Sequence, residues 1–232
     1  QGWAFKPVPE EQIQAFRDKA DAADIHPVFL HGIYLINLGT PNPENLAKGI
    51  ASLTHYMNTA AQIGAAGVVF HGGSHRGAGY DAIFDQTVNA LRQVLDNSPP
   101  NVRLCIENSA GMGNHIGATF QEIGNFIQAL EDPRVKVCLD TQHLFASGYE
   151  CTTVTGLEAT MEEFDRRIGL SNLAAIHAND SKTPFASGVD RHENLGHGQI
   201  GLEGMVVIMS HPAFRNMPFF LEVPGLTNKG PD

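Results

Sequence analysis

The chain alternates between short continuous apolar runs and longer segments in which apolar residues recur every three or four positions. Continuous apolar runs are typical of strands buried on both faces, and the periodic segments predict amphipathic helices. Strands that alternate with helices in this way form a parallel sheet. We predict six strands, in the runs PVFLHG (27–32), GVVFHGG (67–73), VRLCIENSAG (102–111), VKVCLDTQH (135–143), LAAIHAND (173–180) and PFFLEVPG (218–225).

Six helices are predicted between and around these strands, over residues 10–25, 42–64, 81–97, 119–130, 157–168 and 202–209. In the fourth helix, Thr119 occupies the N-cap position and Glu122 the capping-box position. If DTQH, directly after the fourth strand, begins a helix, His143 lies one turn after Asp140.

Each predicted strand ends in a side chain that can bind a metal. These residues are His31, His71, Glu107, Asp140, His177 and Glu222. Polar groups at every carboxyl strand end predict a (β/α)8 TIM barrel, whose active site lies on that face. A doubly wound sheet would instead gather its site at a single switch point.

Only six strands are visible, whereas a closed barrel needs eight. We therefore expect the barrel to be truncated at its N-terminus, with two strands upstream of Gln1. The strands at 28–30 and 219–221 should then have unpaired edges. We expect residues 1–232 to form one domain, incomplete at this end.

The composition is that of an ordinary globular chain, with 232 residues, 42% hydrophobic and 17% charged. No apolar run is long enough to span a bilayer, and no signal peptide is visible. Three cysteines without a C-x-x-C motif predict no disulfide framework and a reducing, cytoplasmic location. The net charge of −10 disfavours nonspecific binding of polyanions by the bare protein, although bound cations would reverse that sign locally.

Three further residues join the six strand-end candidates. His143 follows Asp140 by three positions, and Asp190 and His192 lie two apart in the polar, glycine-rich segment 189–201. Each residue alone is most often a structural polar group. Nine converging groups, however, would be costly to bury without cations. Mixed imidazole and carboxylate ligands favour Zn²⁺, with Mn²⁺ or Fe²⁺ as alternatives at one site.

Two glycine-rich segments carry weaker signals. GMGNHIG (111–117) lacks the spacing of a dinucleotide fingerprint and is interpreted as a loop after a strand. HGGSHRG (71–77) either offers backbone N–H groups to a phosphate or is a plain turn.

Three stretches of the sequence resemble signatures of the endonuclease IV family, the zinc-dependent apurinic/apyrimidinic endonucleases. They are HGIYLINLG (31–39), VCLDTQH (137–143) and IHANDSKTPFASGVDRH (176–192). All nine candidates fall on ligand positions of the family. The resemblance implies a trinuclear zinc site in which His31 and His71 hold the first ion, and Glu107 bridges to the second and orients the nucleophile. Asp140, His177 and Glu222 complete the second ion's ligands, and His143, Asp190 and His192 hold the third.

The resemblance also implies the activity. The family hydrolyses the phosphodiester 5′ to an abasic site in double-stranded DNA and leaves a 3′-hydroxyl, and the loop with Tyr34 and Leu35 would enter the duplex. We expect a monomer that contacts no membrane. Three positions depart from the family pattern, with Gln142 in place of Cys, Ala186 in place of Gly and His197 in place of an acidic residue. Of a basic, Trp-containing loop that contacts DNA in the family, only Gly2-Trp3 is present.

Two alternatives stay open. A sugar isomerase or epimerase with a xylose-isomerase-like barrel would use Glu107, Asp140, His177 and Glu222, but it leaves the other five candidates without a role. The second alternative is a non-catalytic remnant that binds metal or DNA.

Overall fold

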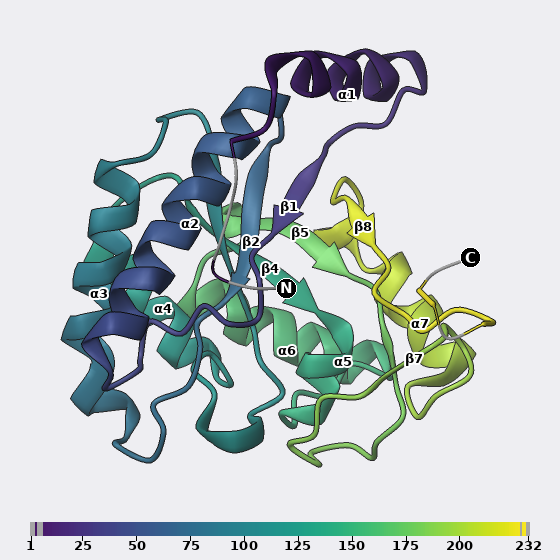
Figure 1. Ribbon diagram of the computed structural model, residues 1–232. Coiled ribbons are helices and arrows are strands. Elements are labelled where there is room, and N and C mark those ends of the chain that lie inside the picture. The colour runs from purple at the N-terminus through teal and green to yellow at the C-terminus, as the bar shows by residue number, and fades with distance from the viewer. Residues whose placement is uncertain (1–2, 4–6, 228, 231–232) are drawn as a thin grey trace.

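The computed structural model describes residues 3, 7–227 and 229–230. Six parallel strands form one sheet in the order β1-β2-β3-β4-β5-β8. The strands are β1 (Phe29–His31), β2 (Gly67–His71), β3 (Arg103–Glu107), β4 (Val135–Asp140), β5 (Leu173–His177) and β8 (Phe219–Phe220). The sheet curls into an open barrel wall, so the predicted TIM-barrel fold is confirmed (Figure 1).

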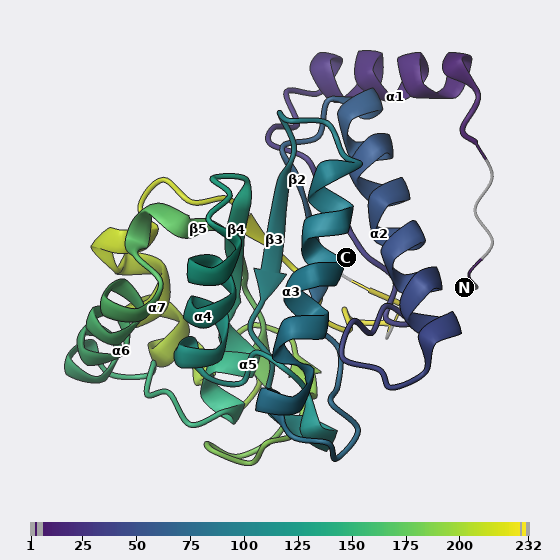
Figure 2. The same ribbon diagram turned by 90° about the vertical axis from the view of Figure 1, so that its left-hand side faces the viewer.

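Seven α-helices accompany the strands among the described residues. They are α1 (Glu10–Ala22), α2 (Pro43–Ile63), α3 (Tyr80–Asp96), α4 (Phe120–Leu130), α5 (Thr141–Ala146), α6 (Val154–Arg167) and α7 (Gly201–Ser210). Short 3₁₀ turns lie at Met112–Asn114, Leu170–Asn172 and Pro212–Phe214. Helices α2, α3 and α4 lie side by side along the outer face of the sheet (Figure 2). None of the helices in the described part of the chain is long and apolar enough to cross a membrane.

The strands are buried on both faces, which explains their continuous apolar sequences. Residues such as Val68, Leu104 and Val137 belong to the large core under the helices, whereas Val69, Cys105 and Cys138 belong to a small cluster inside the curl. Phe29 of β1 and Phe220 of β8 pack against this inner cluster with ring centroids 5.7 Å apart. Among the described residues β1 pairs only with β2, and β8 only with β5, as expected for the two edges.

Most predicted elements are confirmed to within a few residues. The Thr119 hydroxyl caps α4 by accepting from the Glu122 N–H at 3.2 Å, as expected. Glu122, however, does not close a capping box onto Thr119: its carboxylate accepts from the N–H groups of Gly117 and Ala118 instead. Gly117 has a left-handed φ of 86°, and the chain at this turn presents the N–H groups of Gly117 and Ala118 to the Glu122 carboxylate.

One small element was not predicted. Strands β6 (Asp180–Ser181) and β7 (His192–Glu193) form a two-residue antiparallel pair. The composition of 189–201 predicts a loop, and two-residue strands carry no periodicity that could indicate otherwise. The pairing opposes Ser181 and His192, and it thereby ties the chain that carries Asp190 and His192 back to the end of β5.

Candidate metal centre

The structure brings all nine candidate residues together at the carboxyl ends of the strands. Parallel strands place their carboxyl ends on one face, so groups distant in sequence converge there. Four overlapping groups of side chains have their ligand atoms within 4.8 Å of one another. The groups are His31, His177 and Glu222; His31, His71 and Glu107; Asp140, His143 and His192; and Glu107, Asp140, His177 and Glu222.

Glu107 lies at the centre of the cluster and is fully buried. Its Oε2 is 2.9 Å from His31 Nε2 and 3.6 Å from His71 Nε2. Its other oxygen, Oε1, is 2.9 Å from His177 Nδ1. The two oxygens therefore serve opposite sides of the cluster, which is the arrangement that a bridging carboxylate requires.

A second set of groups surrounds His177. Its Nδ1 is 3.0 Å from Glu222 Oε2 and 3.9 Å from Asp140 Oδ2. The same Asp140 oxygen lies 3.7 Å from His192 Nε2. Asp140 thus stands between this set and the next, although the family resemblance assigned it to the second ion alone.

The third set consists of His143, Asp190 and His192. The Nε2 atoms of the two imidazoles lie 3.3 and 3.5 Å from the oxygens of Asp190. In a tetrahedral zinc site with ligands at about 2.05 Å, ligand atoms lie about 3.3 Å apart. Both Nε2 atoms are buried without a hydrogen-bond partner among the described residues. Buried polar atoms are rarely left unpaired, so these two nitrogens fit a cation held between them.

Backbone carbonyls orient three of the imidazoles. The Nδ1 atoms of His31, His143 and His192 lie 2.8, 2.9 and 3.3 Å from the carbonyl oxygens of Gly32, Asn108 and Glu222. A carbonyl only accepts, so each Nδ1 carries the proton and each Nε2 is directed to the cluster. Metal-binding histidines are oriented in this way.

Two asparagines, which were not predicted from the sequence, fix Asp140. Asn108 Oδ1 accepts from the Asp140 N–H at 2.6 Å, and Asn179 Nδ2 donates to Asp140 Oδ2. Asn179 Oδ1 also accepts from the Glu222 N–H at 2.9 Å. Each asparagine directly follows or closely follows a strand-end ligand in sequence, and that proximity was the available signal.

Asp180 was also missed, and it organises the loop beside the third set. Its carboxylate is fully buried and accepts from five backbone N–H groups. The donors are Ser181, Gly196, Gly198, Ile200 and Gly201, at 2.7–3.3 Å. A short carboxylate that satisfies so many buried donors fixes the conformation of the segment that follows β7.

Burial and neighbouring charges shift the pKa values of several groups in the cluster. Burial alone would lower the pKa of His143, but Asp140, Asp190 and Glu107 outweigh it and raise that pKa to about 10. Burial alone would raise the pKa of Glu107, but the imidazoles of His71 and His177 hold it well below its usual range. A cation that binds His143 must therefore displace a proton from it.

The raised pKa of His143 predicts how the stability of the metal-free protein depends on pH. The folded-state pKa of His143 lies above its ordinary value of 6.5. The stability that its protonated form contributes is therefore fully present below pH 6.5. The contribution is lost as pH rises from 6.5 to about 10. Thermal melting of chelated wild-type protein across this window should show a decline that is smaller in His143→Gln, in which only His177 and His31 still have raised pKa values. Parallel curves for the two proteins would contradict the prediction.

The three departures from the family pattern have different surroundings in the structure. Gln142 is buried, and its Nε2 donates to Ser181 Oγ and to the Val189 carbonyl at 3.2 and 3.0 Å. Ala186 adopts a left-handed backbone with φ of 56°, where a glycine would be unstrained. His197 is exposed and lies in the loop anchored by Asp180, and its N–H donates to the Asn194 carbonyl.

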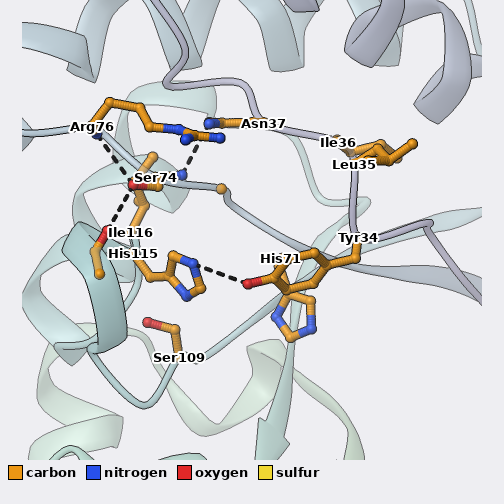
Figure 3. A pocket seen from close by; sticks show the side chains of 12 residues that line it. Tyr34, Leu35, Ile36, Asn37, His71, Ser74, Arg76, Ser109, His115 and Ile116 are labelled. Carbon is orange, nitrogen blue, oxygen red and sulfur yellow. Dashed lines mark hydrogen bonds between the residues drawn. The ribbon is translucent and has the colours of Figure 1, made fainter. Parts of the chain in front are cut away.

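The loop after β1 presents Tyr34 and Leu35 to solvent, with 63% and 43% of their surfaces exposed. The Tyr34 hydroxyl lies 3.3 Å from His115 Nε2, and the Tyr34 ring is 6.0 Å from that of His71 (Figure 3). The two predicted DNA-contacting residues therefore lie at the rim of the ligand cluster. Of the sequence Gly2-Trp3, Gly2 lies outside the described residues.

The chain is similar to known proteins over most of its length. It matches the family described as "Xylose isomerase-like TIM barrel" over residues 1–231. It is 37% identical to "Probable endonuclease 4" of Halothermothrix orenii, over 100% of this chain and 84% of that protein. It is 38% identical to "Probable endonuclease 4" of Trichlorobacter lovleyi, over 96% of this chain and 80% of that protein.

The chain also superimposes on solved structures. Endonuclease IV from Thermus thermophilus superimposes with a TM-score of 0.85 and 31% identity, covering 98% of this chain and 80% of that one. A D-tagatose 3-epimerase-like protein superimposes with a TM-score of 0.72, over 91% of this chain and 76% of that one. Its identity is only 15%, so this second likeness shows the fold alone.

Proposed function

Since the chain belongs to the endonuclease IV family of xylose-isomerase-like TIM barrels, we propose that it is a zinc-dependent DNA repair endonuclease. Its reaction is hydrolysis of the phosphodiester 5′ to an abasic site in double-stranded DNA, which leaves a 3′-hydroxyl. We expect it to act as a monomer in the cytoplasm.

The observation that carries this proposal is the nine-residue cluster with Glu107 at its centre. Three ions would be held by three sets of residues. The first set is His31, His71 and Glu107, the second is Glu107, Asp140, His177 and Glu222, and the third is His143, Asp190 and His192. The buried, unpartnered Nε2 atoms of His143 and His192 support the third. When bound, zinc acts as a Lewis acid that lowers the pKa of water and stabilises negative charge on a phosphate.

The chain's own residues define the side from which the substrate approaches. Glu107, Asp140 and His143 are buried at the bottom of the cluster. The side chains of His31, Asp190 and Glu222 are 32%, 29% and 36% exposed. A phosphodiester therefore approaches over these three residues. Glu107, with one oxygen toward each side, is positioned to orient the attacking water.

The exposed loop after β1 supplies a means of recognising the lesion. Tyr34 and Leu35 stand beside the cluster as apolar groups that can enter a base stack. An abasic nucleotide has no base to unstack, so it leaves the helix at low cost. Insertion of these side chains would select duplexes with a missing base.

The rival function is an epimerase or isomerase acting on sugars. The structural likeness to such enzymes shows the fold alone, and a four-ligand site would leave His31, His71 and three other residues of the cluster without a role. Zinc-loaded protein should nick a duplex with one abasic site, leave the undamaged duplex intact and fail to epimerise ketohexoses. Chelation should abolish the nicking, and zinc should restore it. Epimerisation without nicking would establish the rival.

His71→Ala tests the first metal set. His71 Nε2 is 3.6 Å from Glu107 Oε2, so truncation removes one candidate ligand of the first ion. We expect the nicking rate to fall at least about a hundredfold, because mutation of residues that only orient a metal ligand already costs about 10–100-fold. His55→Ala, a substitution on the outer helix α2, is the control and should keep the wild-type rate. Wild-type activity in His71→Ala would refute the assignment of this ligand.

A further inference from the structure

A cavity of about 300 Å³ adjoins the ligand cluster on the side of β1 and β2. Its walls come from the loop after β1, the turn after β2 and the loop after β3, and His71 lies between it and the cluster (Figure 3). The cavity therefore lies next to the place where the proposed reaction occurs, and His71 is the one ligand candidate among its lining residues.

Two side chains of this cavity, Asn37 and Arg76, present hydrogen-bond donors. Asn37 Oδ1 accepts from the N–H groups of Gly39 and Ser74, both at 3.0 Å. These two bonds fix the orientation of the amide and leave its NH₂ group to donate. The Arg76 guanidinium extends toward Asn37 (Figure 3), and no carboxylate in the described part of the chain pairs with it.

The lining contains no acidic residue among those the structure describes. This contrasts with the neighbouring cluster, in which four of the nine groups are carboxylates. A guanidinium and an amide donor without a counter-charge suit a phosphate, whose oxygens only accept. Ile36 and Ile116 line the cavity as well, and they offer an apolar wall to the sugar that a strand phosphate carries.

The backbone at Arg76 does not require an arginine side chain. Its φ of 52° lies in the left-handed region, which is unfavourable for a residue with a Cβ atom. The turn is held by Ser74 Oγ, which accepts from the Arg76 N–H at 3.2 Å, and by His75 Nδ1, which accepts from Gly79 N–H at 3.0 Å. Glycine would adopt this conformation more easily, so removal of the side chain should not damage the fold.

We propose that Arg76 and Asn37 bind a backbone phosphate of the DNA strand next to the phosphodiester that the ligand cluster cleaves. This inference rests on the proposed function and adds a strand-binding contact to it. The contact is not specific for the lesion, because phosphates are present in damaged and undamaged duplexes alike.

The first test compares wild-type protein with Arg76→Gly, both zinc-loaded. Affinity for an undamaged duplex, measured by fluorescence anisotropy, should fall about tenfold, and the slope of log affinity against log salt should decrease by about one. The DNA concentration for half-maximal nicking of an abasic duplex should rise by the same factor, with the maximal rate unchanged. The melting temperature should not fall. Arg166→Gln, an exposed arginine on α6, is the control and should match wild type.

Asn37→Asp provides a second variant that keeps the fold. The aspartate retains an oxygen for the Gly39 and Ser74 N–H groups but replaces the donor with an anion. It should weaken duplex binding more than Arg76→Gly does, because the new charge repels a phosphate.

Neutral methylphosphonate linkages placed one at a time beside the lesion locate the contact. Wild type should lose about tenfold in affinity at one flanking linkage, and Arg76→Gly should lose nothing further there. Equal affinity and salt slope for wild type and Arg76→Gly, or equal losses at every linkage, would overturn the inference. Absence of nicking by wild type would instead refute the proposed function, while the undamaged-duplex comparison would still decide the phosphate contact.

Discussion

Replacement of Glu107 by Gln is expected to lower the nicking rate by about a thousandfold or more and to remove at least one zinc ion from the purified protein. The amide has nearly the same shape but lacks the negative charge that His31, His71 and His177 surround. Loss of a shared, charged ligand affects two ions at once. A thousandfold loss corresponds to about 4 kcal/mol of transition-state stabilisation.

Single-turnover nicking and zinc content by atomic emission measure the two effects. Glu203→Gln, on the exposed side of α7, is the matched control and should be indistinguishable from wild type. Circular dichroism should show a folded variant. A rate within tenfold of wild type, with the full zinc content, would show that Glu107 is not the bridging group.

Replacement of Asp180 by Asn should have the largest effect on stability. The carboxylate accepts hydrogen bonds from five backbone N–H groups in the segments before and after β7. The NH₂ group of an asparagine would face some of these donors and could not accept from them. Buried donors left unpaired each cost about 1–3 kcal/mol. We expect the free energy of unfolding to fall by about 3–5 kcal/mol, as measured by urea denaturation of metal-free protein.

The same substitution should weaken the third metal set without touching it. His192 lies on β7, opposite Ser181, so loosening of this segment displaces one ligand. Zinc content should fall by about one ion per chain. Asp85→Asn, at an exposed position of α3, is the control. Unchanged stability in Asp180→Asn would contradict the anchoring role assigned to this carboxylate.

The six strand-end residues could be predicted from the sequence because strand and helix patterns place them in register. Each of His31, His71 and Glu107 ends an apolar run, and parallel strands bring such ends to one face. Asp190 and His192 were weaker predictions, since an Asp-x-His in a polar loop is usually a turn. Their link to the centre depends on β6 and β7, which are too short to leave a pattern.

The supporting residues could not be predicted because their partners are backbone atoms far along the chain. Asp180 bonds to amides near residue 200, and Asn108 bonds to residues 140 and 143. Hydrophobic periodicity says nothing about such contacts. The cavity lined by Asn37 and Arg76 could not be predicted either, because these residues come from loops after two different strands. The segment HGGSHRG had been recognised only as a turn or a phosphate-binding loop.

We expect catalysis to require all three metal sets. The most direct measurement is a titration of metal-free protein with zinc, in which ions bound and nicking rate are followed in the same samples on a duplex with one abasic site. We predict that the rate reaches its plateau only as about three ions per chain are bound. Full activity with a single ion, or activity that persists in chelated protein, would contradict the claim.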